Sequence, residues 1–311
     1  MFAFHSDPHG NSGLYLTEAD GTGVRLVSQK LAGDPFARWS PDGEELAFLS
    51  GSFGSGRLLI ADLRGASERV VRSEPVSAFD WSPDGAMLIF EATSGGIWTV
   101  APTQDAVPTR LLDTGHEPVW SPDGRSVAYF DGTDNLTDIY VMSADGSRPR
   151  RLTDNPAADY QPQWSPDGSQ LAFVSERDSN SNLYLVGADG AGLRRLTSDP
   201  APEENLSWAP DGKHVAYVSY RDGADPLAIG IGNAEIYTVE IATGQTVNIS
   251  QNSAWDGDPA WSRDGNWIAF TRRTDHGDLW VMRPDGSGQA MLPGEPTPGF
   301  NDCCPVWRPL P

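Results

Sequence analysis

Four polar side chains occupy the same place in a repeated segment of the chain, three residues before a tryptophan. They are Glu117, Gln161, Asn205 and Asp258, which precede Trp120, Trp164, Trp208 and Trp261. Residues at one offset of a repeated strand face the same way, so the four side chains should surround one opening. A ring of carboxylates and amides could hold a cation or a basic chain segment. Carboxylates that only cap local backbone amides are the alternative interpretation.

Two further residues of these segments are candidates for ligand binding. His116 directly precedes Glu117, and Trp255 directly precedes Asp256. Trp255 could stack on a sugar or on a ligand cation, with packing on its own loop as the alternative. The predicted ligand site therefore comprises Glu117, Gln161, Asn205, Asp258, Trp255 and His116, and no catalytic residue is predicted.

The histidines and cysteines leave two kinds of chemistry open. His5, His9, His116 and His276 are expected on loops of one face, and His214 beside a turn on the other. A cluster of these histidines with Glu117 could hold a divalent cation, and scattered exposed histidines are the alternative. A divalent cation is the one cofactor that the sequence leaves open. Cys303 and Cys304, the only cysteines, could form a vicinal disulfide, remain free thiols or have a redox role.

The tryptophans belong to a repeat that positions these side chains. Trp-Ser-Pro-Asp-Gly begins at Trp39, Trp81, Trp120 and Trp164, with variants at Trp208 and Trp261 and a truncated copy at Trp307. Successive tryptophans are 42, 39, 44, 44, 53 and 46 residues apart, which is typical of a four-stranded propeller blade. Ser-Pro-Asp-Gly fits a type I turn that ends in a glycine of positive φ, as expected at Gly124 and Gly168. The turn aspartates therefore have a structural reason to be present.

The ends of the chain complement each other. Residues 1–31 supply three strands and lack the tryptophan strand, which residues 305–307 supply. We therefore predict an all-β fold, a seven-bladed β-propeller with one-plus-three strand closure between the C- and N-termini, in a single domain of residues 1–311. The expected blades are 300–311 with 1–31, then 34–73, 76–113, 116–154, 159–198, 203–250 and 256–294.

These motifs resemble the TolB-like (WD-like) β-propeller repeat family over essentially the whole chain. The same repeat occurs in prolyl-oligopeptidase-type peptidases and in tricorn-type proteases, and oligogalacturonate lyases are seven-bladed propellers with a metal site. The resemblance implies an extracytoplasmic location, although the first residues have neither the basic nor the apolar region of a signal peptide. It also implies that the candidate residues lie in loops before each tryptophan strand, at the mouth of the central funnel.

Charge and missing motifs narrow the function. With 22 basic and 43 acidic residues the net charge is −21, which would repel nucleic acid, and no apolar run is long enough for membrane insertion. The sequence contains no Gly-x-Ser-x-Gly, His-Glu-x-x-His or P-loop motif. We predict a non-enzymatic binding or scaffold propeller that engages a peptide, a protein segment or a small ligand at the funnel mouth. A metal-dependent lyase or hydrolase acting on a carbohydrate is the alternative, and residues 220–235 are a second place for specificity.

Overall fold

The structure is a computed structural model that describes residues 1–6, 13–29, 37–52, 55–65, 67–133, 136–222, 233–274, 277–292 and 302–309. Every regular element in these ranges is a β-strand, which confirms the all-β prediction. Contacts divide the chain into two compact units. One contains residues 1–29, 178–183 and 195–310, and the other contains residues 30–177 and 184–194.

The unit that contains both described chain ends has three four-stranded antiparallel sheets. The first has the order β27 (Cys303–Trp307), β1 (Phe2–Ser6), β2 (Gly13–Thr17) and β3 (Arg25–Ser28). The second contains β19 (Glu203–Trp208), β20 (His214–Ser219), β21 (Glu235–Glu240) and β22 (Thr246–Asn248). The third contains β23 (Trp255–Trp261), β24 (Ile268–Arg273), β25 (Gly277–Met282) and β26 (Ala290–Met291).

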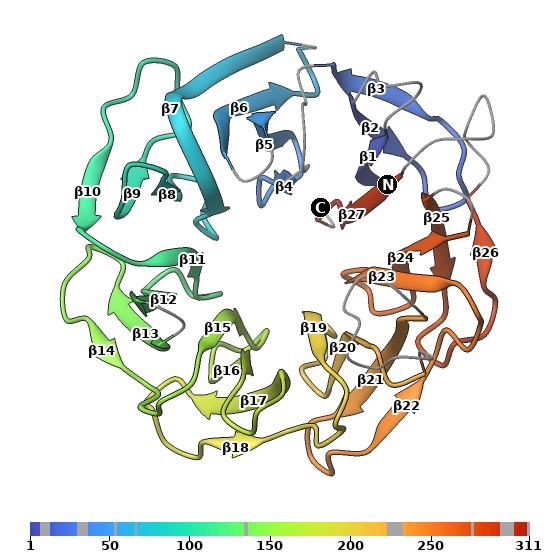
Figure 1. Ribbon diagram of the computed structural model, residues 1–311. Helices are drawn as coiled ribbons and strands as arrows, with labels where there is room; N and C mark the ends of the chain where they lie inside the picture. Colours follow the sequence, from blue (N-terminus) through green and yellow to red (C-terminus); the bar gives the residue numbers. More distant parts are fainter. Residues whose placement is uncertain are drawn as a thin grey trace. The chain divides into compact units, whose positions relative to one another are not determined.

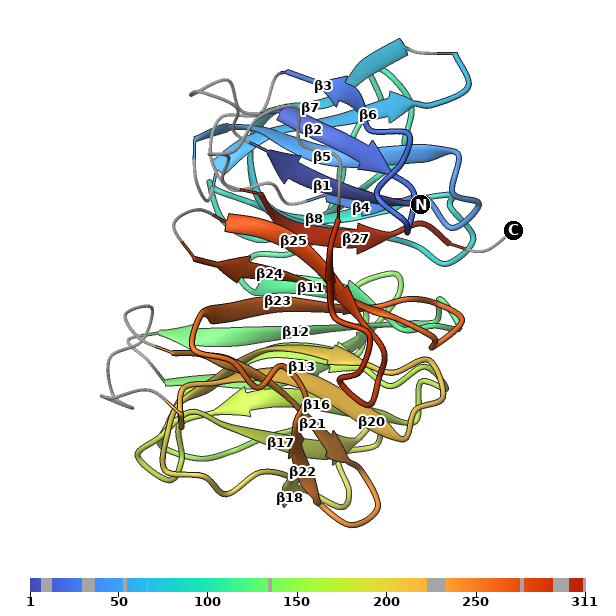
Figure 2. The same ribbon diagram turned by 90° about the vertical axis from the view of Figure 1, so that its right-hand side faces the viewer.

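Strands from the two ends of the chain pair directly. β27 lies antiparallel to β1, with Phe2 opposite Trp307 and Ala3 opposite Val306 (Figure 1). β27 also contacts β23, β24 and β25 of the same unit (Figure 2). The last described strand therefore completes a sheet whose other three strands come from the N-terminal residues.

A seven-stranded sheet and a four-stranded sheet lie in the other unit. The larger sheet has the order β10 (Thr109–Leu112), β9 (Ile97–Val100), β8 (Leu88–Ala92), β7 (Ser67–Trp81), β6 (Ser55–Asp62), β5 (Glu45–Ser52) and β4 (Ala37–Trp39). The smaller contains β11 (His116–Trp120), β12 (Ser126–Thr133), β13 (Leu136–Ser143) and β14 (Arg150–Arg151). The last four-stranded sheet contains β15 (Asp159–Trp164), β16 (Gln170–Ser175), β17 (Asn182–Gly187) and β18 (Arg194–Arg195).

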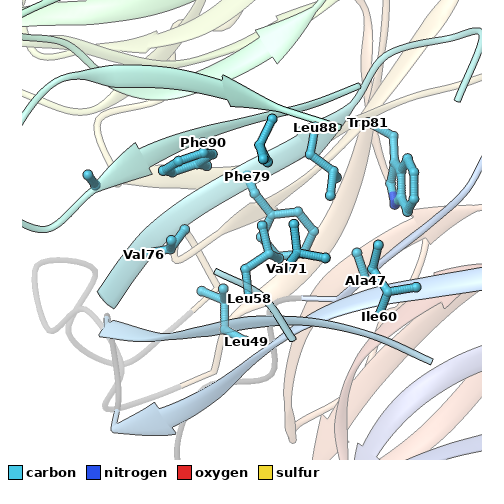
Figure 3. Close-up of a cluster of buried hydrophobic side chains, with 12 residues drawn as sticks. Ala47, Leu49, Leu58, Ile60, Val71, Val76, Phe79, Trp81, Leu88 and Phe90 are labelled. Carbon is cyan, nitrogen blue, oxygen red and sulfur yellow. The ribbon is translucent and has the colours of Figure 1, made fainter. Parts of the chain in front are cut away.

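The seven-stranded sheet arises because β7 is continuous over 15 residues. Its first part pairs with β6 and its last part with β8, where we had expected two strands separated by a loop. Elsewhere such a loop is an Asx turn, in which the side chain of Asn155, Asp199 or Asn252 accepts a backbone N–H two residues on. The sequence Ser73-Glu74-Pro75 contains no Asn or Asp, the residues that make this turn most strongly, and the strand continues. Apolar side chains such as Leu58, Val71 and Phe79 pack between the two parts (Figure 3).

The Ser-Pro-Asp-Gly turns have the predicted conformation. Gly124 and Gly168 have φ of 69° and 70°. In the same two turns the serine hydroxyl donates to the aspartate, over 2.7 Å in Ser121–Asp123 and 2.6 Å in Ser165–Asp167. These bonds lower the pKa of Asp123 and Asp167. The structural interpretation of the turn aspartates is therefore confirmed at these positions.

Three of the repeat tryptophans join neighbouring inner strands. Nε1 of Trp81 donates to the carbonyl of Arg38 over 3.2 Å, and Nε1 of Trp164 donates to Val119 over 3.2 Å. Nε1 of Trp307 donates to Ala260 over 2.9 Å. In each case the acceptor is the residue just before the tryptophan of the preceding repeat, so one indole fixes the spacing of two inner strands.

Candidate functional site

The four offset-three residues lie inside inner strands, not in the loops where we had expected them. Glu117 is in β11, Gln161 in β15, Asn205 in β19 and Asp258 in β23. The loop assignment was wrong because each inner strand continues to pair with its neighbour beyond a β-bulge at this position. A bulge places two residues of one strand opposite a single residue of the next, and it redirects the side chain at the irregularity.

The same irregularity recurs at Cys304 in β27, so five inner strands share it. The single residue opposite the bulge is a buried aromatic each time. These residues are Phe4, Tyr129, Phe173, Tyr217 and Phe270. A buried aromatic side chain therefore lies opposite each bulge, and the bulge is a regular feature of the repeat.

The first bulge residue is left-handed in all five strands. φ is 44° at Glu117, 54° at Gln161, 53° at Asn205, 52° at Asp258 and 61° at Cys304. A residue other than glycine adopts this conformation at a cost of about 1–2 kcal/mol. Glycine would avoid the cost, yet none of the five is glycine. Strain of this kind is concentrated at functional sites, which singles out these side chains.

Glu117 lies in a cluster that contains a second carboxylate. Oε1 of Glu91 in β8 is 2.9 Å from Nδ1 of His116, and its Oε2 accepts the backbone N–H of Glu117 over 3.1 Å. The imidazole of His116 stacks on Phe130, with ring centroids 5.2 Å apart. Glu91 was missed in the sequence because its contacts cross from one sheet to another, which no local pattern indicates.

The carboxylate of Glu117 is electrostatically unlike an ordinary surface acid. It forms no hydrogen bond with any residue in the described ranges. Burial and the charge of Glu91 raise its pKa to about 7, against the opposing influence of His116 and Arg38. Asp80 in β7 behaves similarly, because burial raises its pKa to about 6 although it accepts the backbone N–H of Trp120 over 2.9 Å. Both acids therefore retain a proton to a higher pH than an exposed carboxylic acid does.

Asp258 is held on both sides. Its Oδ2 accepts the hydroxyl of Thr271 over 3.1 Å, and its Oδ1 lies 3.5 Å from Nδ2 of Asn205. Thr271 also accepts the backbone N–H of Cys304 over 3.4 Å. The structure thus brings Asn205 and Asp258 together and links three sheets through them. Gln161 differs, because its half-buried side chain makes no hydrogen bond within the part of the chain that the structure describes.

The ring of Trp255 is in contact with several side chains of the same unit. Its ring packs against Ala201, Val218, Tyr220 and Ala234, and the guanidinium of Arg273 lies 4.1 Å from the ring centroid. These contacts favour the packing interpretation, because they already occupy much of the aromatic surface that a ligand would use.

Buried carboxylates five residues before the tryptophan form a second repeated pattern. Asp159, Glu203 and Asp256 are fully buried. Each pairs with an arginine that follows or ends the next strand, over 2.8 Å to Arg177, 2.9 Å to Arg221 and 2.7 Å to Arg272. Each guanidinium lies 4.1 to 4.4 Å from the centroid of an aromatic ring. A buried charge is costly unless it is paired, so these acids are structural. An acid followed 16 or 18 residues later by arginine is the signal that sequence reasoning overlooked.

Comparison with known proteins agrees with the repeat. Residues 97–230 match the TolB beta propeller domain. This part of the chain carries TolB-like β-propeller repeats. A Tol-Pal system protein TolB from Anaeromyxobacter dehalogenans is 30% identical over 154 residues, which cover 46% of the chain and 36% of the relative. The matched part therefore spans about a third of that relative's length.

Solved structures show the same fold. TolB from Acinetobacter baumannii superposes with a TM-score of 0.64 at 19% identity, over 99% of this chain and 66% of that one. An oligogalacturonate lyase in complex with manganese superposes with a TM-score of 0.66 at 15% identity, over 96% and 85%. At these identities the likeness establishes a β-propeller fold.

The structure places the other candidate features of the chain only in part. His9, His276 and residues 223–232 of the insertion lie outside the described residues. Within those residues no group of three or more His, Cys, Asp and Glu side chains could hold a metal ion, and no helix is long and apolar enough to cross a membrane. Cys303 and Cys304 are not joined in a disulfide, and Sγ of Cys303 is 4.0 Å from Nδ1 of His5.

Proposed function

We propose that this protein is a binding propeller that engages a basic segment of a protein or peptide at the funnel mouth, through the bulged inner strands. The observation that carries the proposal is the left-handed conformation of polar residues at one repeat offset. Replacing any of them with glycine would remove the backbone strain, so the side chains themselves have a use. The names of the curated relatives, proteins of the Tol-Pal system, also favour a protein partner.

The proposal includes seven blades in one closed ring. The seven-stranded sheet then counts as two blades, with β7 as the outer strand of the first and the inner strand of the second. The sheet of β27 and β1–β3 is the composite blade. The blade limits are those expected from the sequence, and the left-handed residues of successive blades would surround one funnel mouth.

Glu117 is the candidate that best suits a cationic group. Both oxygens of Glu91 are already engaged by His116 and by the backbone of Glu117, whereas the carboxylate of Glu117 makes no hydrogen bond in the described part of the protein. A free, partly desolvated carboxylate pairs well with the two parallel N–H groups of a guanidinium. The net charge of −21 would attract such a segment over long range. Asp258 is a weaker candidate, because its two carboxylate oxygens already accept hydrogen bonds from Thr271 and Asn205.

Binding of basic peptides tests the proposal. The probe is an array of peptides in which one arginine or lysine is the only charged side chain. The strongest binder is then studied by calorimetry at two ionic strengths. Glu117→Gln should weaken that binder about tenfold or more, because a charge-assisted hydrogen bond contributes roughly 1.5–3 kcal/mol. The variant should also reduce the salt dependence of the affinity.

Asp145→Asn is the matched control. It makes the same change of net charge, but Asp145 lies in an exposed turn, where its side chain caps the N–H of Ser147 over 2.9 Å. This control should bind like the wild type. If Glu117→Gln and Asp145→Asn bind the peptide equally well, the bulged strands are not the site.

A metal-dependent enzyme acting on a carbohydrate is the second candidate, favoured by the fold likeness to a manganese-bound oligogalacturonate lyase. Mass spectrometry of the purified protein should find less than one divalent ion per chain if the protein is a binding module. One ion per chain together with manganese-dependent cleavage of oligogalacturonate would replace the binding proposal with the enzymatic one.

A further inference from the structure

A single carboxylate joins β8 and β11, which belong to neighbouring sheets of one unit. Oε1 of Glu91 is 2.9 Å from Nδ1 of His116, and Oε2 accepts the backbone N–H of Glu117 over 3.1 Å. The side chain of Glu91 is only 15% exposed, and that of His116 is 45% exposed. Since both oxygens of Glu91 bind the same short segment, this residue fixes the start of β11 against β8.

A second acid next to this contact opposes it when ionised. The carboxylate of Glu117 feels the negative charge of Glu91 and is partly removed from water. Two ionised carboxylates in such surroundings repel each other more strongly than they would in bulk solvent. Protonation of Glu117 would remove this repulsion and provide an O–H donor beside Glu91.

The other charged groups around β11 are already engaged. The positive charge of Arg38 in β4 lowers the pKa of Glu117. Asp80 of β7 accepts the N–H of Trp120 over 2.9 Å. Asp131 of β12 accepts the hydroxyl of Thr114 over 2.7 Å, and Asp159 of β15 is paired with Arg177 over 2.8 Å. The charge of Glu117 is therefore governed by its burial and by Glu91, His116 and Arg38.

We propose that Glu91, His116 and Glu117 form a pH-sensitive tie between the sheets of β8 and β11, firm in mild acid and weaker above neutral pH. In mild acid Glu117 holds a proton, and Glu91 keeps its contacts with Nδ1 of His116 and with the backbone N–H of Glu117 without a second negative charge beside it. As the pH rises, Glu117 releases its proton to solvent and becomes a second negative charge beside Glu91. The tie concerns the protein without any ligand, so it goes beyond the proposed function and stands independently of it.

The direction of the effect follows from proton linkage. Burial and the charge of Glu91 raise the pKa of Glu117 from 4.5 to about 7. The folded protein then binds this proton more tightly than the unfolded chain does. The stabilisation is complete below pH 4.5 and is lost as the pH rises through 7.

Hydrogen exchange by mass spectrometry, corrected for intrinsic pH dependence, tests the tie in the wild-type protein. The peptide spanning residues 113–120 contains the Glu117 amide that Glu91 accepts. Its protection should fall about tenfold between pH 5.5 and pH 8, the change that roughly 1.4 kcal/mol produces. Glu117→Gln, which resembles the protonated acid, should keep the acid-like protection at both pH values. Asp145→Asn should behave like the wild type.

Glu91→Gln provides a second, independent variant. It removes the repelling charge and should reduce the pH response, of which burial of Glu117 maintains a part, while weakening the contact with His116 at both pH values. Protection of residues 113–120 that does not vary with pH in the wild type would overturn the proposal. So would an undiminished pH response in either Glu117→Gln or Glu91→Gln, because the response would then come from another group.

Discussion

Replacing Trp307 tests whether pairing between the two chain ends stabilises the fold. The ring of Trp307 lies 5.0 Å from that of Phe2, centroid to centroid. Its Nε1 donates to the carbonyl of Ala260 over 2.9 Å. β27 itself pairs with β1 at the inner edge of the same sheet. The indole therefore makes an aromatic contact with the first strand and a hydrogen bond to the preceding repeat.

The structure sets the magnitude of each loss. Removing a buried tryptophan side chain costs about 3–5 kcal/mol. Trp307 is only half-buried, so Trp307→Ala should lower the free energy of unfolding by about 3 kcal/mol. Trp307→Phe keeps a ring against Phe2 and loses the hydrogen bond, which should cost about 1 kcal/mol.

Urea unfolding monitored by far-UV circular dichroism measures both values. Trp164→Phe is the matched control, since Nε1 of Trp164 makes the same type of bond to Val119 over 3.2 Å. It should also cost about 1 kcal/mol. If Trp307→Ala remains within about 0.5 kcal/mol of the wild type, the pairing of β27 with β1 does not contribute to stability and the closure argument fails.

Three further predictions concern the strand edge, the turns and the buried acids. Deleting residues 302–309 should expose the edge of β1, so that size-exclusion chromatography detects aggregates; a monomeric deletion variant that unfolds like the wild type would contradict the closure. Gly124→Val or Gly168→Val should destabilise by about 1–3 kcal/mol. The cause is the positive φ of 69° and 70°. A steric clash is not the cause, since an added Cβ would lie at ordinary contact distances of 3.6 and 3.5 Å from proline Cδ atoms. A neutral result would refute the backbone strain. Burial raises the pKa of Glu203 to about 7, although Thr197 and Arg221 oppose the shift. The folded state therefore binds that proton more tightly, so the urea midpoint should fall from pH 5 to pH 8, and it should fall less in Glu203→Gln.

The turns and the repeat were predictable because their causes are local. Ser-Pro-Asp-Gly contains the residue that fixes φ, the aspartate that caps an N–H and the glycine that accepts a positive φ. These four residues specify the turn without help from the rest of the chain. The match between a missing tryptophan strand at one end and a spare one at the other likewise needed only the order of motifs.

The site was less predictable because its causes lie across strands and sheets. The common offset of Glu117, Gln161, Asn205 and Asp258 was visible, but the bulge depends on how many residues of the next strand lie opposite. Counting residues in one strand cannot give that register. The contact of Glu91 with His116 crosses from β8 to β11, so it has no fixed spacing in the sequence. β7 is continuous because its sequence lacks the residues of an Asx turn. A missing turn motif is harder to recognise in a sequence than one that is present.

The bulged positions separate what the repeat holds constant from what it varies. A buried aromatic residue lies opposite each of the five inner-strand bulges and φ is left-handed at the first residue of each, so the backbone supplies the same frame whatever side chain it carries. Glu117 and Asp258 occupy that frame with the same chemical group, yet one faces Glu91 and the other is bonded by Thr271. The difference arises from neighbours on adjacent strands and not from the frame. The function of each such side chain must therefore be assigned from its own contacts. Equivalent positions in the repeat share a backbone conformation, but their side chains need not share a function.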